Sequence, residues 1–292
     1  MTLVSVPELV ELLDSDARVT VLDVRWSLPV PDGRAAYEAA HIPGAVYVDL
    51  ESELSDHTVT GRGRHPLPTG AALQGALRRW GVDTEDTVVV YDDWNRAGSA
   101  RAWWVLRAAG LGDVRILDGG WSAWVGADAA TQTGPAPTRE GTITVTHDDL
   151  YAGALPTLTA EQAAARARSG VVLDARAPER YRGEVEPVDA VAGHIPGALN
   201  LPSTEVLRED GTFADAEKLK ALFGDRGADG TGTVGAYCGS GVTAAVIAVA
   251  AARAGIDVEL FPGSWSQWSS DPRNPVETGG GVAPRNESNH SK

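Results

Sequence analysis

The stretch Val172-Leu173-Asp174-Ala175-Arg176 decides the fold, because it repeats Val21-Leu22-Asp23-Val24-Arg25 from the first half of the 292-residue chain. Three further blocks recur in the same order: His41-Ile42-Pro43-Gly44-Ala45 as His194-Ile195-Pro196-Gly197-Ala198, Val88-Val89-Val90-Tyr91-Asp92 as Val234-Gly235-Ala236-Tyr237-Cys238, and Gly120-Trp121-Ser122-Ala123-Trp124 as Ser264-Trp265-Ser266-Gln267-Trp268. Four blocks in one order, each about 150 residues from its counterpart, predict two copies of one domain.

Each copy is expected to be an α/β domain. Short apolar strands alternate with helical stretches in both halves, a pattern typical of a mainly parallel sheet flanked by helices. Both copies also begin with a capping-box pattern at a helix start, Ser5-Val6-Pro7-Glu8 and Thr159-Ala160-Glu161-Gln162. The predicted boundaries are 1–125 for a non-catalytic domain, 126–158 for a linker, 159–277 for a catalytic domain and 278–292 for a disordered tail.

The single cysteine, Cys238, stands between an apolar run at 233–237 and an alanine-rich run at 243–254. We predict a buried strand, a sharp turn through the glycines and a helix, in that order. Such a turn points backbone N–H groups at one place, and the start of the helix adds positive potential, so a thiolate is favoured there. Cys238 is therefore a candidate nucleophile. The candidate anion-binding residues are those of the loop that follows it: Gly239, Gly241, Val242 and Thr243.

These features together resemble the tandem-domain rhodanese family of sulfurtransferases. The resemblance rests on the two-domain layout, the two His-Ile-Pro-Gly-Ala blocks, the paired Trp-Ser-x-Trp segments and the single loop cysteine, and it covers about residues 3–272. The loop from Cys238 to Thr243 is similar to that of the 3-mercaptopyruvate sulfurtransferases, whereas thiosulfate-specific members usually carry basic residues after the cysteine. The resemblance implies transfer of a sulfane sulfur from a small anionic donor, 3-mercaptopyruvate or thiosulfate, through a Cys238 persulfide and without a cofactor.

The acceptor implied by this chemistry lies outside the chain. Since Cys238 has no second cysteine to resolve its persulfide, the sulfur must pass to a thiol or to cyanide. A thioredoxin-like protein or a small thiol is the expected thiol acceptor.

The resemblance also implies a substrate-binding arginine. The segment Glu179-Arg180-Tyr181-Arg182-Gly183 is similar to the Gly-Arg-Phe-Arg-Gly segment of the mercaptopyruvate enzymes, whose first arginine binds the substrate carboxylate. A guanidinium suits a planar carboxylate because it can bond both oxygens. The family's second substrate arginine is missing, because Val188 stands at its position; Arg182 and Arg96 are the candidates to replace it, and the sequence leaves open whether either does.

A Ser-His-acid group is the third implied feature. Ser240, His65 and Glu51 match such a group in the mercaptopyruvate enzymes, and the histidine is expected to shuttle the proton that a leaving enolate needs. His65 and Glu51 belong to the first copy, in which Asp92 replaces the cysteine. The first copy is therefore expected to pack against the second and cover its site.

Composition excludes several other functions. Forty acidic and 25 basic residues give a net charge of −15, which disfavours nucleic acid and anionic membranes as partners. The strongly apolar stretch 242–252 is too short to span a bilayer, and the N-terminus lacks a signal-peptide pattern. One cysteine excludes an internal disulfide, no Cys/His cluster has zinc spacing, and a cytoplasmic location is predicted.

Two alternatives stay open. A phosphatase or arsenate reductase with a related loop would need an arginine where Ala244 stands, so its phosphate ligand would lack a bidentate partner. A sulfur carrier that delivers its persulfide to one protein, without turnover, would keep the same loop. The paired residues that recur in both copies, including His41 and His194, are expected to be structural, since the first copy has no nucleophile.

Overall fold

The structure, a computed structural model, describes residues 2–280. The first domain is built on a five-stranded parallel sheet with the strand order β1-β5-β4-β2-β3. Its strands are β1 Leu3–Val4, β2 Val19–Asp23, β3 Val46–Tyr47, β4 Thr87–Tyr91 and β5 Val114–Leu117. Its helices are α1 Val6–Asp14, α2 Arg34–Ala39, α3 Leu50–Glu53, α4 Gly70–Arg79, α5 Ala97–Ala108 and α6 Gly120–Gly126.

The second domain repeats this plan with a four-stranded parallel sheet in the order β7-β6-β8-β9. Its strands are β6 Val171–Asp174, β7 Leu199–Asn200, β8 Val234–Tyr237 and β9 Val258–Leu260. Its helices are α7 Ala160–Ser169, α8 Pro178–Tyr181, α9 Ala216–Gly224, α10 Ala244–Ala254 and α11 Ser264–Trp268. A single parallel bridge from Thr157 to Leu260 takes the place of β1.

The predicted α/β fold of two tandem domains is confirmed, and so are the two helix starts. Ser5 and Thr159 each cap a helix, and each forms the reciprocal capping box with a side chain three residues later, which satisfies N–H groups that have no partner inside the helix. The predicted linker contains one 3-10 turn, Leu150–Ala152. Of the predicted tail, residues 281–292 lie outside the described part of the chain, and the N–H of Gly279 donates to the carbonyl of Arg182 at 2.9 Å.

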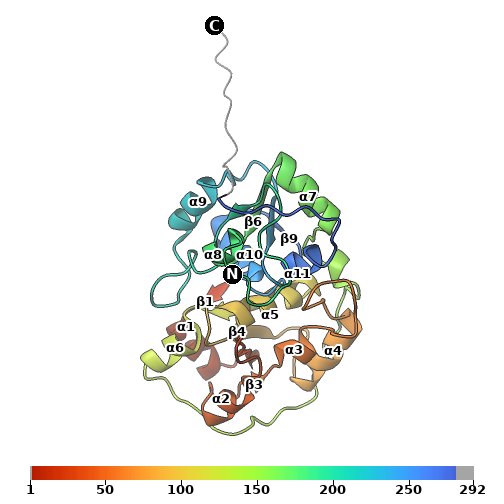
Figure 1. Cartoon of the computed structure of the whole chain (residues 1–292). Coiled ribbons are helices and arrows are strands. Elements are labelled where there is room, and N and C mark those ends of the chain that lie inside the picture. The colour runs from red at the N-terminus through yellow and green to blue at the C-terminus, as the bar shows by residue number, and fades with distance from the viewer. Residues whose placement is uncertain (1, 281–292) are drawn as a thin grey trace.

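One hydrophobic core cluster spans both domains, and each domain has a smaller cluster of its own. A single cluster of buried apolar side chains extends from strands of the first sheet to strands of the second, and helices α5 and α10 pack against each other at its centre. Figure 1 shows both helices between the two sheets. Because α5 follows β4 and α10 follows β8, the turns that precede these helices lie at the boundary between the domains. The predicted cysteine loop therefore faces the first domain.

Candidate active site

The loop after β8 holds the thiol of Cys238 at the start of a helix. Cys238 directly follows β8 and is 1% exposed, and α10 begins six residues later. The backbone N–H of Gly241 donates to the Cys238 sulfur at 3.1 Å. Gly241 has φ +82°, and a methyl group there would come within 2.4 Å of the Pro262 carbonyl oxygen, so only glycine fits. The predicted strand, turn and helix are confirmed, and the turn directs positive potential at the sulfur.

Helix α11 braces this loop from behind. The N–H groups of Trp265 and Ser266 donate to the carbonyls of Cys238 and Gly239 at 3.0 and 2.9 Å, and the Ser264 hydroxyl accepts the N–H of Cys238 at 3.1 Å. These are N–H groups of the first turn of α11, which have no partner within their own helix. With these carbonyls bound there, the loop is held in the conformation in which the N–H of Gly241 donates to the sulfur. The repeated Trp-Ser-x-Trp block was the signal in the sequence, but it indicated packing rather than this support.

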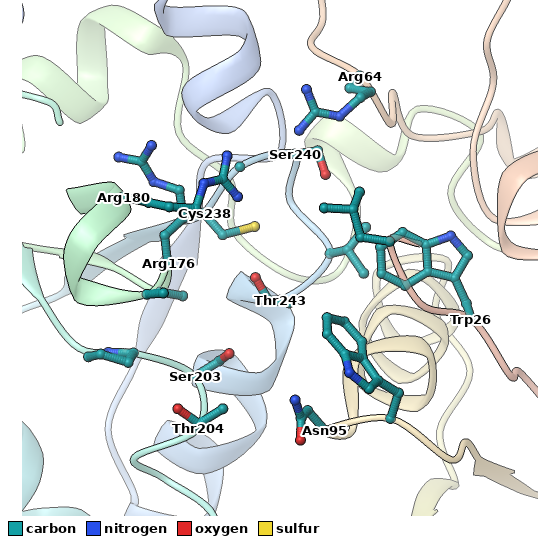
Figure 2. Close-up of a pocket in the computed structure, with 17 residues that line it drawn as sticks. Trp26, Arg64, Asn95, Arg176, Arg180, Ser203, Thr204, Cys238, Ser240 and Thr243 are labelled. Carbon is teal, nitrogen blue, oxygen red and sulfur yellow. The ribbon is translucent and has the colours of Figure 1, made fainter. Parts of the chain in front are cut away.

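The sulfur faces a cavity of about 290 Å³ between the two domains. Figure 2 shows Arg176 and Arg180 on one side of the sulfur and Trp26 on the other. The first domain contributes Trp26, Leu28, Arg64, Trp94 and Asn95 to the lining, and the second contributes Ala175, Arg176, Ala177, Arg180, Pro202, Ser203, Thr204, Cys238, Gly239, Ser240, Val242 and Thr243. The first domain thus forms part of the wall around the nucleophile, as the sequence predicted.

Ser240, His65 and Glu51 form a hydrogen-bonded chain across the domain boundary. His65 Nδ1 lies 2.7 Å from the Ser240 hydroxyl, and His65 Nε2 lies 3.1 Å from Glu51 Oε1. The hydrogen bond from His65 lowers the pKa of Glu51 to about 2, while burial lowers the pKa of His65. Because an ionised carboxylate only accepts, Nε2 of the neutral ring carries the proton and Nδ1 accepts from Ser240. The structure therefore brings these three predicted residues together.

Further side chains, which the sequence analysis did not single out, hold the Ser240–His65–Glu51 group in place. The Trp26 indole N–H donates to Glu51 Oε1 at 2.6 Å, and His57 Nε2 lies 2.9 Å from the other oxygen of Glu51. Arg101 of α5 is fully buried and donates to the His65 carbonyl at 3.0 Å. Burial lowers the pKa of Arg101 to about 10, so it stays a cation at neutral pH. Their positions depend on packing between the domains, for which the sequence carries no local signal.

The arginines near the cavity differ from the prediction in part. Arg180 lines the cavity, as predicted, but its Nε and Nη2 groups are bound to Glu186 at 3.3 and 2.5 Å. The two candidates to replace the missing second arginine do not line the cavity. Arg182 pairs with Glu184, and Arg96 is buried and pairs with Asp92 at 3.0 Å. Each of these two arginines pairs with a carboxylate near it in sequence instead of facing the cavity, and the residue types alone do not reveal this pairing.

Arg64 is the cation that the sequence analysis missed. Its guanidinium lines the cavity and is 29% exposed, and its Nη1 donates to Asp189 of the second domain at 2.7 Å. Its position directly before His65 was the available signal.

The recurring histidines have matching structural surroundings. His41 and His194 are buried, stack on Tyr37 and Tyr181, and place Nδ1 at 2.9 and 2.7 Å from the carbonyls of those tyrosines. Within residues 2–280, no group of three or more His, Cys, Asp or Glu side chains is arranged to hold a metal ion. None of the helices in this range is long and apolar enough to cross a membrane.

Comparison with known proteins defines the class to which this fold and site belong. The rhodanese-like domain matches the chain twice, over residues 5–127 and 159–271. The chain belongs to the rhodanese family, and it is a sulfurtransferase enzyme.

Individual relatives cover nearly the whole chain. A Mycobacterium tuberculosis protein, "Putative thiosulfate sulfurtransferase SseB", is 61% identical over 278 residues, which cover 95% of this chain and 97% of that protein. The 3-mercaptopyruvate sulfurtransferase of Escherichia coli K12 is 36% identical over 268 residues, which cover 90% of this chain and 93% of that protein. The crystal structure of SseA from Escherichia coli superimposes with a TM-score of 0.79 at 34% identity and covers 91% of this chain and all of that chain.

Proposed function

We propose that this sulfurtransferase takes the sulfur of 3-mercaptopyruvate onto Cys238 and passes it, as a persulfide, to an outside thiol or to cyanide. The relatives point to two donors, because the 61% identical protein is named for thiosulfate and the 36% identical one for 3-mercaptopyruvate. The observation that carries our choice is the hydrogen-bonded chain from Ser240 through His65 to Glu51 beside the nucleophile.

The proposed first step needs no reagent besides the donor. The Cys238 thiolate attacks the donor sulfur, a sulfur–sulfur bond forms, and the carbon–sulfur bond breaks with its electron pair on the leaving enolate of pyruvate. The new persulfide gives up the proton that the donor thiol brought, and the enolate carbon takes up one proton to become pyruvate. The Gly241 N–H, 3.1 Å from the sulfur, and the start of α10 stabilise the resulting persulfide anion.

The leaving group distinguishes the two donors. Thiosulfate would transfer its outer sulfur and release sulfite, which needs no proton, whereas an enolate must be protonated. The neutral His65 ring accepts from Ser240 and donates to Glu51, so these groups can relay one proton to and from the cavity. A proton relay beside the nucleophile therefore favours a donor whose leaving group is an enolate, which is 3-mercaptopyruvate.

The second half of the reaction depends on an outside acceptor. Cys238 is the only cysteine of the chain, so the persulfide is discharged when an external thiolate or cyanide attacks its outer sulfur and the Cys238 thiolate leaves. A thioredoxin-like protein or a small thiol as acceptor, and a cytoplasmic location, stay predictions from the sequence.

The deciding measurement is kcat/KM for 3-mercaptopyruvate and for thiosulfate on one preparation, with cyanide as the common acceptor. We expect 3-mercaptopyruvate to be the better donor. A higher kcat/KM with thiosulfate would overturn the donor assignment. A single turnover per chain with both donors would instead support a sulfur carrier.

A further inference from the structure

The donor's carboxylate needs a partner that Arg180 alone does not supply. The two nitrogens that form the fork of Arg180, Nε and Nη2, hold Glu186, which is 3% exposed and also accepts the N–H groups of Val188 and Asp189 at 3.1 Å each. Among residues 2–280, Nη1 of Arg180 has no hydrogen-bond partner. Arg180 therefore offers a donor one nitrogen rather than a bidentate fork.

Arg64 offers a second nitrogen at the same place. A methyl group built on Gly239, the residue after the nucleophile, would lie 3.4 Å from Arg64 Nη2 and 3.6 Å from Arg180 Nη1. Within the described residues, Arg64 Nη2 also has no hydrogen-bond partner. Two cationic N–H groups, one from each domain, thus converge beside Gly239 in the cavity that holds the thiol. Figure 2 shows the two side chains reaching the loop from different segments, Arg180 from the left and Arg64 from the upper right.

Arg64 is held rigidly enough to act as a binding residue. Its Nη1 is fixed by Asp189, which is 8% exposed and whose other oxygen lies 3.6 Å from Arg180 Nη2. Its own backbone N–H donates to the Ser266 hydroxyl at 3.0 Å. Directly before it, Gly63 has φ +86° and passes so close to the Gly263 carbonyl oxygen that a methyl group would lie 2.3 Å from it. A side chain fixed before the ligand arrives loses little freedom on binding.

We propose that Arg64 is a specificity-determining residue that binds the donor's carboxylate together with Arg180, one carboxylate oxygen to each guanidinium. The inference rests on the proposed function and names the ligand group: the carboxylate of a 2-keto acid that carries its sulfur on the next carbon. Asp189 orients both arginines but does not itself touch the donor. Donor binding therefore requires a residue of the first domain.

Steady-state kinetics test this role through two donors that differ by one charge. With 3-mercaptopyruvate, Arg64→Ala should raise KM about 10- to 150-fold, the range for losing a hydrogen bond to a charged group, while kcat changes less than about threefold. With mercaptoacetone, which lacks the carboxylate, the variant should match the wild type. The control is Arg62→Ala, because Arg62 lies over the Tyr151 ring at 4.5 Å and does not line the cavity.

Alkylation of the thiol tests the same contact without any turnover. Cys238 is the only cysteine, so its rates with anionic iodoacetate and neutral iodoacetamide are read directly by mass. Arg64→Ala should slow iodoacetate relative to iodoacetamide by at least about tenfold, and Arg64→Lys should do so less, since it keeps the charge but not the planar fork. An unchanged ratio in both variants would overturn the proposal. A changed ratio in an enzyme that prefers thiosulfate would reject the proposed donor but keep Arg64 as an anion-binding residue.

Discussion

The loops after β4 and β8 occupy equivalent places in the two domains, but the first encloses its own anion whereas the second leaves an anion site open. In the first loop Asp92 is fully buried, accepts the N–H of Ser99 at 2.9 Å and lies 3.0 Å from Nη2 of Arg96. In the second loop Cys238 receives one N–H and borders a cavity. In the first copy, the start of α5 is occupied by the Asp92 carboxylate. In the second copy, the start of α10 is available to an anionic substrate.

Two backbone features of the turn are shared by both copies. Trp121 N–H donates to the Asp92 carbonyl at 2.9 Å, as Trp265 N–H does to the Cys238 carbonyl at 3.0 Å. The third residue after each of these positions, Asn95 or Gly241, has positive φ. The two loops differ in the residue at the end of the strand, in the side chains of the turn and in the length of the turn, since α5 begins five residues after Asp92 and α10 six residues after Cys238.

Replacing the nucleophile should give the largest effect. We expect Cys238→Ser to reduce sulfur transfer below about a thousandth of the wild-type rate, because a hydroxyl is a far weaker nucleophile than a thiolate. Circular dichroism and thermal unfolding should match the wild type, since the two side chains are nearly isosteric. Substantial residual transfer, measured with cyanide as acceptor, would show that the open loop is not the site.

Removing the buried carboxylate of the first loop should lower the stability of the protein. Asp92→Ala leaves the 3% exposed guanidinium of Arg96 without its carboxylate, so the free energy of unfolding should fall by about 3–5 kcal/mol. Urea denaturation measures this change, with Asp93→Ala at an exposed neighbouring position as control. A loss no larger than that of the control would mean that the enclosed pair is not what stabilises the first loop.

Removing the proton relay should lower turnover of 3-mercaptopyruvate much more than turnover of thiosulfate. His65→Asn is expected to lower kcat with 3-mercaptopyruvate about 100-fold, the scale of general acid–base catalysis, and to change turnover of thiosulfate little. Because burial lowers the pKa of His65, its neutral form persists below pH 6.5, and the wild-type rate should fall only in more acid solution, where the ring is protonated and no longer accepts from Ser240. An equal loss with both donors would contradict a role in protonating the enolate.

Placing a cysteine in the first loop is expected to have no effect on sulfur transfer. Asp92→Cys in a Cys238→Ser background should carry no persulfide after donor treatment, because the first loop is closed around position 92, and the stretch from Tyr91 to Trp121 is longer than that from Tyr237 to Trp265. Intact mass before and after incubation with 3-mercaptopyruvate gives the answer. A gain of one sulfur would show that the residue type alone separates the two loops.

The sequence predicted what depends on local pattern and on repetition. The apolar run and glycines around Cys238 predicted the strand, turn and helix, and Ser5 and Thr159 predicted two helix starts. It did not predict contacts that arise when distant segments pack. Arg64 reaches Asp189 across 125 positions of the chain, and the fork of Arg180 is taken by Glu186, so the choice among candidate cations depended on carboxylate positions that only the fold fixes.

The core cluster around α5 and α10 packs the two domains against each other as two different subunits pack in a heterodimer, but here both belong to one chain. In an enzyme whose site lies between separate subunits, dilution below the dissociation constant takes the site apart and specific activity falls with concentration. Here the partner that brings Arg64, His65 and Glu51 is covalently attached, so its effective concentration is fixed by the tether. Specific activity should then be independent of enzyme concentration, down to the most dilute solution in which turnover is detected.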